Sequence, residues 1–144
     1  MNVPNTAGWK HIGDSSNTRY FAVAERILGG VPLPGSKDDG ATAEENVVFQ
    51  NGYFRTSKPG VVVIFFDNLA SQDKDARRVY QTRPDPNVLL GTALVGGSLL
   101  SRAMGSFFLG LSKPKVPVKM FKNLDEARAW ASELIAANRQ EQTT

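Results

Sequence analysis

The chain of 144 residues contains no cysteine and a single histidine. Without cysteine it can form no disulfide, thiolate zinc site, iron–sulfur cluster or cysteine nucleophile. The one histidine, His11, lies in a polar N-terminal stretch, and general-base catalysis needs a positioned partner that the sequence does not suggest. We therefore expect His11 to be a surface residue. The same absences predict a protein that is not an enzyme and has no catalytic residue, no cofactor and no metal site.

Long hydrophobic runs and a strong excess of one charge are also missing. The most apolar stretch, residues 88–111, contains Arg102, whereas a membrane span needs about 20 apolar residues. The net charge is only +3, and the lysines between 113 and 122 are more typical of a soluble edge strand than of a phosphate-binding surface. The N-terminus does not resemble a secretory signal. These features predict a cytoplasmic protein with no membrane span and no nucleic-acid partner.

The composition is that of an ordinary folded protein of one domain, with 41% hydrophobic and 22% charged residues. Residues 1–18 are polar and predict an irregular N-terminal arm, in which Trp9 would be loosely held. A single domain is expected over residues 19–139, followed by a frayed tail over residues 140–144.

The N-terminal half of the domain predicts a hairpin and then an element with two interpretations. Short apolar runs over 19–24 and 27–33 flank Glu25-Arg26 and indicate two paired strands. For residues 42–56, Thr42 followed by Glu45 fits a capping box at the start of a helix. Asn51-Gly52 alternatively fits the turn of a second hairpin. We favour the helix, because an acidic first turn has no use in a strand.

The C-terminal half alternates strands with helices. Residues 61–66 form a continuous apolar run, which is typical of a central strand covered on both faces. Ser71 is expected to cap a helix with Asp73 and Asp75 in its first turn. A strand over 89–95, a helix with an apolar face over 100–111, a strand over 116–121 and a last helix follow. Pro117 places the strand over 116–121 at a sheet edge, or itself lies at the start of that strand. Asn123 would cap that last helix, and Trp130 would be buried on its apolar face.

The resulting fold class is α/β, with five strands and four helices in the order ββαβαβαβα and a mostly parallel sheet opened by an antiparallel hairpin. Ligands of such sheets meet the loops at the carboxyl ends of the strands. Two of these loops contain Asp67 and the glycine turn at residues 96–98. We interpret Asp67 as a loop or cap acceptor and the glycines as a packing turn, because neither a metal-ligand set nor a phosphate-binding motif accompanies them.

Several segments carry a family resemblance: QDKDAR at 72–77, ALV at 93–95, SLLSRAMGSFFL at 98–109, KPKVPVKMF at 113–121 and AW at 129–130. They resemble the small stand-alone bacterial STAS-like proteins, also labelled STAS/SEC14-like, which are similar to anti-sigma-factor antagonists. The resemblance implies a STAS-like mixed sheet with packed helices. The antagonists carry a phosphorylated serine in an Asp-Ser-Ser/Thr-Gly motif that this sequence lacks, since Ser71 is the only hydroxyl between Asp67 and Asp75.

Two functions are compatible with these features. The first is a non-catalytic regulatory module that binds a protein partner, with a surface formed by Ser71, Asp73, Asp75, Arg77 and Arg78. The second is a carrier or sensor of a small apolar, lipid-like ligand held under the helix at 100–111. A homodimer is compatible with either function.

Overall fold

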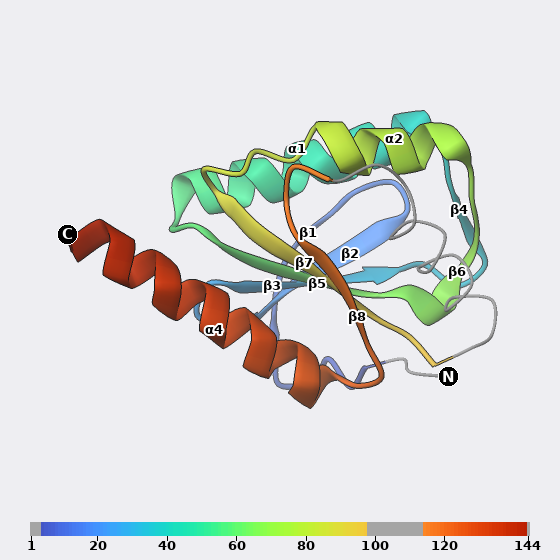
Figure 1. Ribbon diagram of the computed structural model, residues 1–144. Coiled ribbons are helices and arrows are strands. Elements are labelled where there is room, and N and C mark those ends of the chain that lie inside the picture. The colour runs from blue at the N-terminus through green and yellow to red at the C-terminus, as the bar shows by residue number, and fades with distance from the viewer. Residues whose placement is uncertain (1–3, 98–113, 144) are drawn as a thin grey trace.

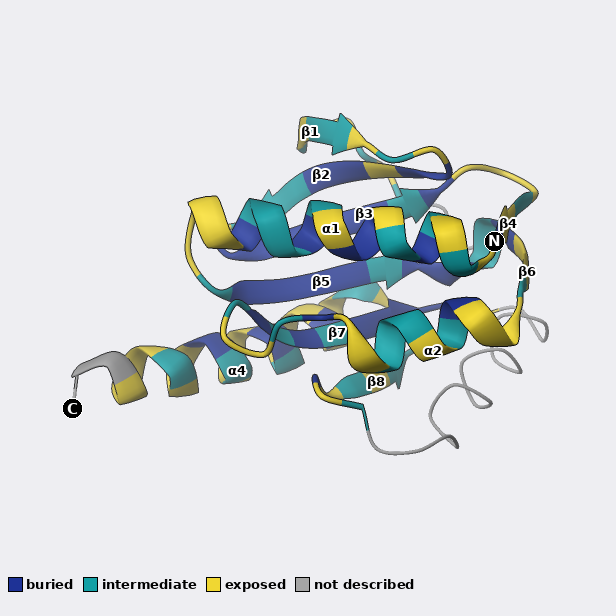
Figure 2. Ribbon diagram, turned by 90° about the horizontal axis from the view of Figure 1, so that it is seen from above, coloured by how far each residue is buried: buried dark blue, intermediate teal, exposed yellow. Residues whose placement is uncertain are grey.

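A computed structural model of the protein describes residues 4–97 and 114–143. Its main feature is a six-stranded mixed sheet in the order β1-β2-β3-β5-β7-β8 (Figure 2). The first three strands form an antiparallel meander, and β3, β5, β7 and β8 run parallel. The strands are β1 (Lys10–Asp14), β2 (Thr18–Ala24), β3 (Ile27–Pro32), β5 (Gly60–Phe65), β7 (Leu89–Val95) and β8 (Val118–Phe121).

A second, smaller sheet lies at one end of the molecule (Figure 1). It pairs β4 (Ser36–Asp38) in parallel with β6 (Leu69–Gln72). A 3₁₀ turn, η1 (Phe66–Asn68), connects β5 directly to β6. The small sheet therefore lies directly after β5, and a helix follows each of its two strands.

Helices cover both faces of the main sheet. Helices α1 (Gly40–Thr56) and α2 (Lys74–Thr82) pack side by side on one face, and α4 (Leu124–Thr143) covers the other (Figures 1 and 2). Alternate residues of β5 supply the two cores: Val61 and Val63 pack with α4, and Val62 packs with Phe54 of α1. This two-sided burial confirms the interpretation of the apolar run at 61–66. Among the described residues, no helix is long and apolar enough to cross a membrane.

The structure confirms several predicted elements. The hairpin of β2 and β3, the strand at 89–95 and the position of β8 at the sheet edge are as expected. Residues 42–56 form a helix rather than a hairpin, but Asp39 is its N-cap and not Thr42. The Thr42 N–H donates to Asp39 Oδ1 at 2.9 Å, and the Asp39 N–H donates to Thr42 Oγ1 at 2.8 Å. The capping box exists, but it begins three residues earlier than predicted.

The predicted count of five strands and four helices is wrong in detail. The structure has a six-stranded sheet and a two-stranded sheet, with three α-helices in the described part of the chain. The predicted helix at 100–111 lies outside the described residues. The three strands that the sequence did not predict, β1, β4 and β6, have three to five residues each and consist mostly of polar and small residues, so they lack an apolar alternation. Strand β1 lies within the N-terminal arm that was expected to be irregular.

The ends of two helices also differ from the predictions. Ser71 belongs to β6, and Asp73 caps α2 by accepting the Ala76 N–H at 2.9 Å. Ser71 was expected to be this cap. Serine and aspartate are both favoured at N-caps, so the presence of a serine did not exclude the aspartate two residues further on. The cap of α4 is as predicted, since Asn123 Oδ1 accepts the Glu126 N–H at 2.9 Å. Helix α4 continues to Thr143 through the tail that was expected to fray.

The N-terminal arm is docked on the sheet rather than loose. The Trp9 ring lies 5.8 Å from the Phe65 ring and 6.2 Å from the Phe21 ring, centroid to centroid. Trp9 is partly buried on the same core cluster as Trp130, which packs at 5.5 Å from Phe121. The expectation that Trp9 is loosely held is therefore wrong, because a single anchoring aromatic in a polar stretch gives no periodic signal.

We predict that truncation of either tryptophan lowers the stability of the fold. A loosely held Trp9, as the sequence suggested, would instead leave the stability unchanged when truncated. Trp130→Ala removes an indole between α4 and the sheet and is expected to cost about 3 kcal/mol, whereas Trp9→Ala is expected to cost about 1–2 kcal/mol. Denaturant unfolding of both variants measures this. An unchanged midpoint for Trp9→Ala would show that the arm is not docked in solution.

Candidate functional site

A small cavity of about 50 Å³ lies between the main sheet and the layer formed by α1 and α2. One part of its wall is apolar and the rest is polar, and both parts come from segments far apart in the sequence. The apolar residues are Pro32, Ile64, Phe66, Leu69, Pro84 and Leu94. The polar residues are Asn17, Thr18, Tyr20, Asp38, Asn46, Gln50, Gln72, Tyr80 and Thr92.

Asn46 is the centre of a hydrogen-bonded group of these residues, which we call the polar cluster. Its members are Asn17, Tyr20, Asp38, Asn46, Gln50, Gln72 and Tyr80. The Asn46 side chain points inward from α1 and is only 3% exposed. Asn46 Oδ1 accepts bonds from the Tyr20 hydroxyl at 2.9 Å and the Ser15 hydroxyl at 2.6 Å. Asn46 Nδ2 donates to Asn17 Oδ1 at 2.9 Å and to the Tyr80 hydroxyl at 3.1 Å. One side chain thus ties α1 to β2, to the segment before β2 and to α2.

Asp38, at the end of β4, is the charged member of the polar cluster and is 5% exposed. Its Oδ1 accepts bonds from the Thr42 hydroxyl at 2.6 Å and from Asn17 Nδ2 at 3.4 Å. Its Oδ2 accepts bonds from the Tyr80 hydroxyl at 2.8 Å and from Gln72 Nε2 at 3.1 Å. All four donors are neutral, and within residues 4–97 and 114–143 no basic side chain forms a salt bridge with this carboxylate.

Both tyrosines of the cluster are held in their protonated form. Burial raises the pKa of Tyr20 above its ordinary value. Burial also raises the pKa of Tyr80, and the negative charge of Asp38 adds to the effect. At neutral pH the two hydroxyl groups therefore act as hydrogen-bond donors and not as bases.

Two carboxamide oxygens at the cavity are left without protein donors. Gln50 is 4% exposed, and its Nε2 donates to the Tyr20 hydroxyl at 3.1 Å. No described residue donates to Gln50 Oε1. Gln72 Oε1 is buried and also has no hydrogen-bond partner. No group of three or more His, Asp or Glu side chains that could hold a metal ion occurs in the described part of the chain.

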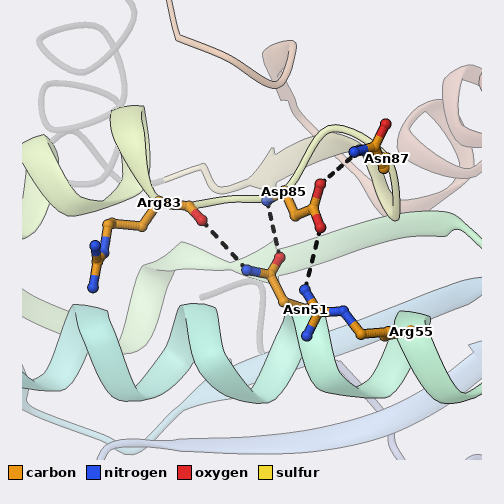
Figure 3. A network of polar contacts seen from close by, with 5 residues as sticks. All are labelled: Asn51, Arg55, Arg83, Asp85 and Asn87. Carbon is orange, nitrogen blue, oxygen red and sulfur yellow. Dashed lines mark hydrogen bonds and ion pairs between the residues drawn. The ribbon is translucent and has the colours of Figure 1, made fainter.

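A polar clamp fixes the chain on either side of Pro84, a buried residue of the cavity wall (Figure 3). Asn51 of α1 uses both ends of its amide: Nδ2 donates to the Arg83 carbonyl at 3.3 Å, and Oδ1 accepts the Asp85 N–H at 3.1 Å. Arg55, one turn further along α1, forms an ion pair with Asp85 at 3.2 Å. The clamp joins the segment between α2 and β7 to α1.

The surface that the sequence predicted for a partner lies outside the cavity, at the start of α2. Ser71 is exposed on β6, and Asp73 and Asp75 are exposed in the cap and first turn of α2. Arg78 is exposed, whereas Arg77 is half-buried and donates back to a main-chain oxygen of β6 at 3.1 Å. The structure brings these five residues together at one end of a helix, but none of them lines the cavity.

Two other sequence interpretations concern single residues. Asp67 accepts the Gly97 N–H at 3.1 Å, as expected of a loop acceptor. His11 is a surface residue, as expected, with 43% of its side chain exposed and Nε2 at 2.7 Å from Asp14. Sequence reasoning missed the polar cluster. A signal was present in Asn46 and Gln50, which are one helical turn apart on the same face as the apolar Val47 and Phe54.

The fold and the site define a small mixed α/β domain with a polar cluster buried beside a cavity. The chain belongs to the family described as a domain of unknown function (DUF7793), whose model matches residues 40–135. No curated protein and no solved structure matches the chain. The matched region runs from the start of α1 into α4. It includes Asn46, Gln50 and Tyr80, whereas Tyr20 and Asp38 precede it.

We predict that Asn46→Ala is strongly destabilising, because it leaves the hydroxyls of Tyr20 and Tyr80 and the amide of Asn17 without their buried partner. Buried polar groups that lose their partners cost about 1–3 kcal/mol each, so a total loss of about 3 kcal/mol is expected in urea unfolding. Val48→Ala is the control on the same helix, since Val48 is 65% exposed. It should change stability by less than about 0.5 kcal/mol. Equal effects would show that the cluster is not formed.

The clamp makes a second prediction about pH. The Asn87 N–H, which donates to Asp85 Oδ1 at 2.9 Å, lowers the pKa of Asp85, and Arg55 lowers it further. Because the pKa of Asp85 is lower in the folded than in the unfolded state, its ionised carboxylate stabilises the fold at pH values above the ordinary pKa of 3.8. This stabilisation is lost as the pH falls through the lowered pKa. In Asp85→Asn the unfolding midpoint should therefore fall less steeply than in the wild type on acidification below that value. If the unfolding midpoints of the two proteins fell equally steeply on acidification, the result would contradict the clamp.

Proposed function

We propose that this protein is a non-catalytic regulatory domain that binds a small, partly apolar molecule in the cavity between the sheet and helices α1 and α2. The observation that carries the proposal is the combination of an apolar wall with a buried oxygen, Gln72 Oε1, that has no hydrogen-bond partner. A buried polar atom without a partner costs free energy. Such atoms beside a cavity therefore favour an occupant that hydrogen-bonds to them.

The hydrogen bonding of the cluster supports binding rather than catalysis. The Tyr20 and Tyr80 hydroxyls donate within the cluster, and their raised pKa values keep them protonated. The Asp38 carboxylate already accepts four hydrogen bonds. General-base and nucleophilic catalysis need an available lone pair on a group with a suitable pKa, and these three groups have none to offer.

A regulatory role is supported by the origin of the cavity wall. Gln50 comes from α1, Tyr80 from α2 and Thr92 from β7, so an occupant contacts both helices and the sheet at once. A molecule that binds one arrangement of these elements more tightly shifts the population toward it. The resemblance to STAS-like proteins, which is based on sequence, is compatible with this role and with a cytoplasmic location.

A second candidate function is binding of a protein partner at the start of α2. Ser71, Asp73, Asp75 and Arg78 are exposed together there, on the helix whose Tyr80 lines the cavity. Asp75 and Arg78 are both exposed, so the charge-reversed double variant Asp75→Lys, Arg78→Glu is expected to fold and to lose association with a partner that uses this surface. Capture experiments in which the double variant retains every wild-type partner would contradict this second function.

The proposed ligand binding is tested with a small neutral amphiphile, 1-butanol, followed by methyl NMR of the full chain. We expect saturable shifts confined to the methyl groups of Ile64, Leu69 and Leu94. Leu94→Phe adds volume to the cavity wall and should abolish the shifts, whereas Val48→Phe adds the same ring on the exposed face of α1 and should preserve them. Shifts that are absent from these methyl groups, or that survive in Leu94→Phe, would contradict the proposal.

A further inference from the structure

We propose that the molecule bound in this cavity is a primary amine, whose ammonium group donates hydrogen bonds to the unpaired oxygens of the wall beside the buried Asp38. This inference rests on the proposed function and specifies the class of ligand.

The charge of the cavity wall is the first argument. Asp38 is the only charged residue among the described residues that line the cavity. Its carboxylate is buried, and its four hydrogen-bond donors carry no positive charge. Burying one uncompensated charge is costly, and a second charge of the same sign would add to that cost, whereas a cation reduces it. The wall therefore disfavours phosphates, carboxylates and anionic lipid headgroups.

The direction of the hydrogen bonds is the second argument. A carboxylate can only accept hydrogen bonds, so Asp38 fixes the Tyr80 hydroxyl as its donor. Tyr80 then accepts from Asn46 Nδ2, which turns Asn46 Oδ1 toward the Tyr20 hydroxyl. Tyr20 in turn accepts from Gln50 Nε2. The chain of bonds from Asp38 to Gln50 thus ends on an oxygen, Gln50 Oε1, which has no donor among the described residues.

Gln72 is oriented in the same way, by a direct hydrogen bond to Asp38. Its Nε2 faces the acceptor-only Asp38 carboxylate, so Oε1 points away from it and has no partner. Thr92 also lines the cavity, and a threonine hydroxyl can accept a third bond. An ammonium group carries three donors and no acceptor. It therefore complements a wall of unpaired oxygens, whereas a carboxylate or phosphate offers only further acceptors.

The size of the cavity limits the rest of the ligand. Its volume of about 50 Å³ is well below the roughly 150 Å³ of an engineered cavity that binds benzene. It holds an ammonium group and a few methylene groups, for which Ile64, Leu69 and Leu94 provide apolar contacts. A short alkylamine is thus the simplest probe of the site.

The experiment compares three probes with the same four-carbon chain on the full-length protein at pH 7: n-butylamine, 1-butanol and butyrate. Affinity is measured from the NMR shifts of the Ile64 and Leu94 methyl groups. We expect n-butylammonium to bind about tenfold more tightly than 1-butanol, a difference that corresponds to one buried charge interaction, and butyrate to cause no shift.

Two variants assign this preference to the cavity. Asp38→Asn removes the buried charge and should reduce the preference for the amine over the alcohol to about twofold or less. Asp75→Asn removes one negative charge from the exposed start of α2, outside the cavity, and should retain the tenfold preference. The wild-type comparison tests the inference even if Asp38→Asn does not fold.

The contradictory outcomes separate the inference from the proposed function. If butyrate binds as tightly as n-butylamine, or if Asp75→Asn weakens the preference as much as Asp38→Asn, the amine assignment is wrong and the cavity still binds a ligand. If no probe shifts the cavity methyl groups, the proposed function fails, and the amine assignment fails with it.

Discussion

The buried carboxylate of Asp38 can accept hydrogen bonds but cannot donate them, and the arrangement of the polar side chains around it follows from this constraint. Tyr80 must donate to it, so Asn46 must present its nitrogen to Tyr80 and its oxygen to Tyr20. Tyr20 is then left to accept from Gln50. A single charge therefore sets the orientation of groups on three different elements, α1, α2 and β2, and leaves Gln50 Oε1 at the end of the chain without a donor among the described residues.

The same cluster explains how the small sheet, the helices and the main sheet are held in one arrangement. Asp38 lies at the end of β4, Asn46 on α1, Tyr80 on α2 and Tyr20 on β2. Apolar packing alone is non-directional and tolerates sliding of helices over a sheet. Hydrogen bonds between buried groups are directional, and a displaced helix would leave several of them unpaired at once. The clamp around Asp85 adds a second fixed point between α1 and the segment after α2.

Strong local patterns made part of this fold predictable from the sequence. The apolar run at 61–66 could be satisfied only by a strand covered on both faces, and the Asn123 cap lies three residues before Glu126. Strands β4 and β6 have three and four residues, and their pairing depends on a partner more than 30 positions away. Local pattern does not contain that information. The capping interaction of α1 was recognised, but Thr42 takes the N3 position instead of the N-cap.

The site was less predictable than the fold, for a related reason. Asn46 and Gln50 could be recognised as polar residues on an inward helix face, but their partners come from β2, β4 and α2. Only the three-dimensional arrangement brings them together. Residues with conspicuous chemistry in the sequence, such as His11 and Asp67, have local surface or loop roles. The residues that form the cavity are neutral amides and hydroxyls that are common in any protein.

The most direct measurement of the central claim is a double-mutant cycle between Asp38→Asn and Tyr20→Phe in denaturant unfolding. Asp38 and Tyr20 form no hydrogen bond with each other and are connected through Asn46, which is joined to Asp38 by way of Tyr80 and by way of Asn17. If Asp38 sets the orientation of the whole chain of bonds, the two substitutions are coupled by about 0.5 kcal/mol or more. Additive losses of stability would show that the hydrogen bonds are independent and would contradict the account.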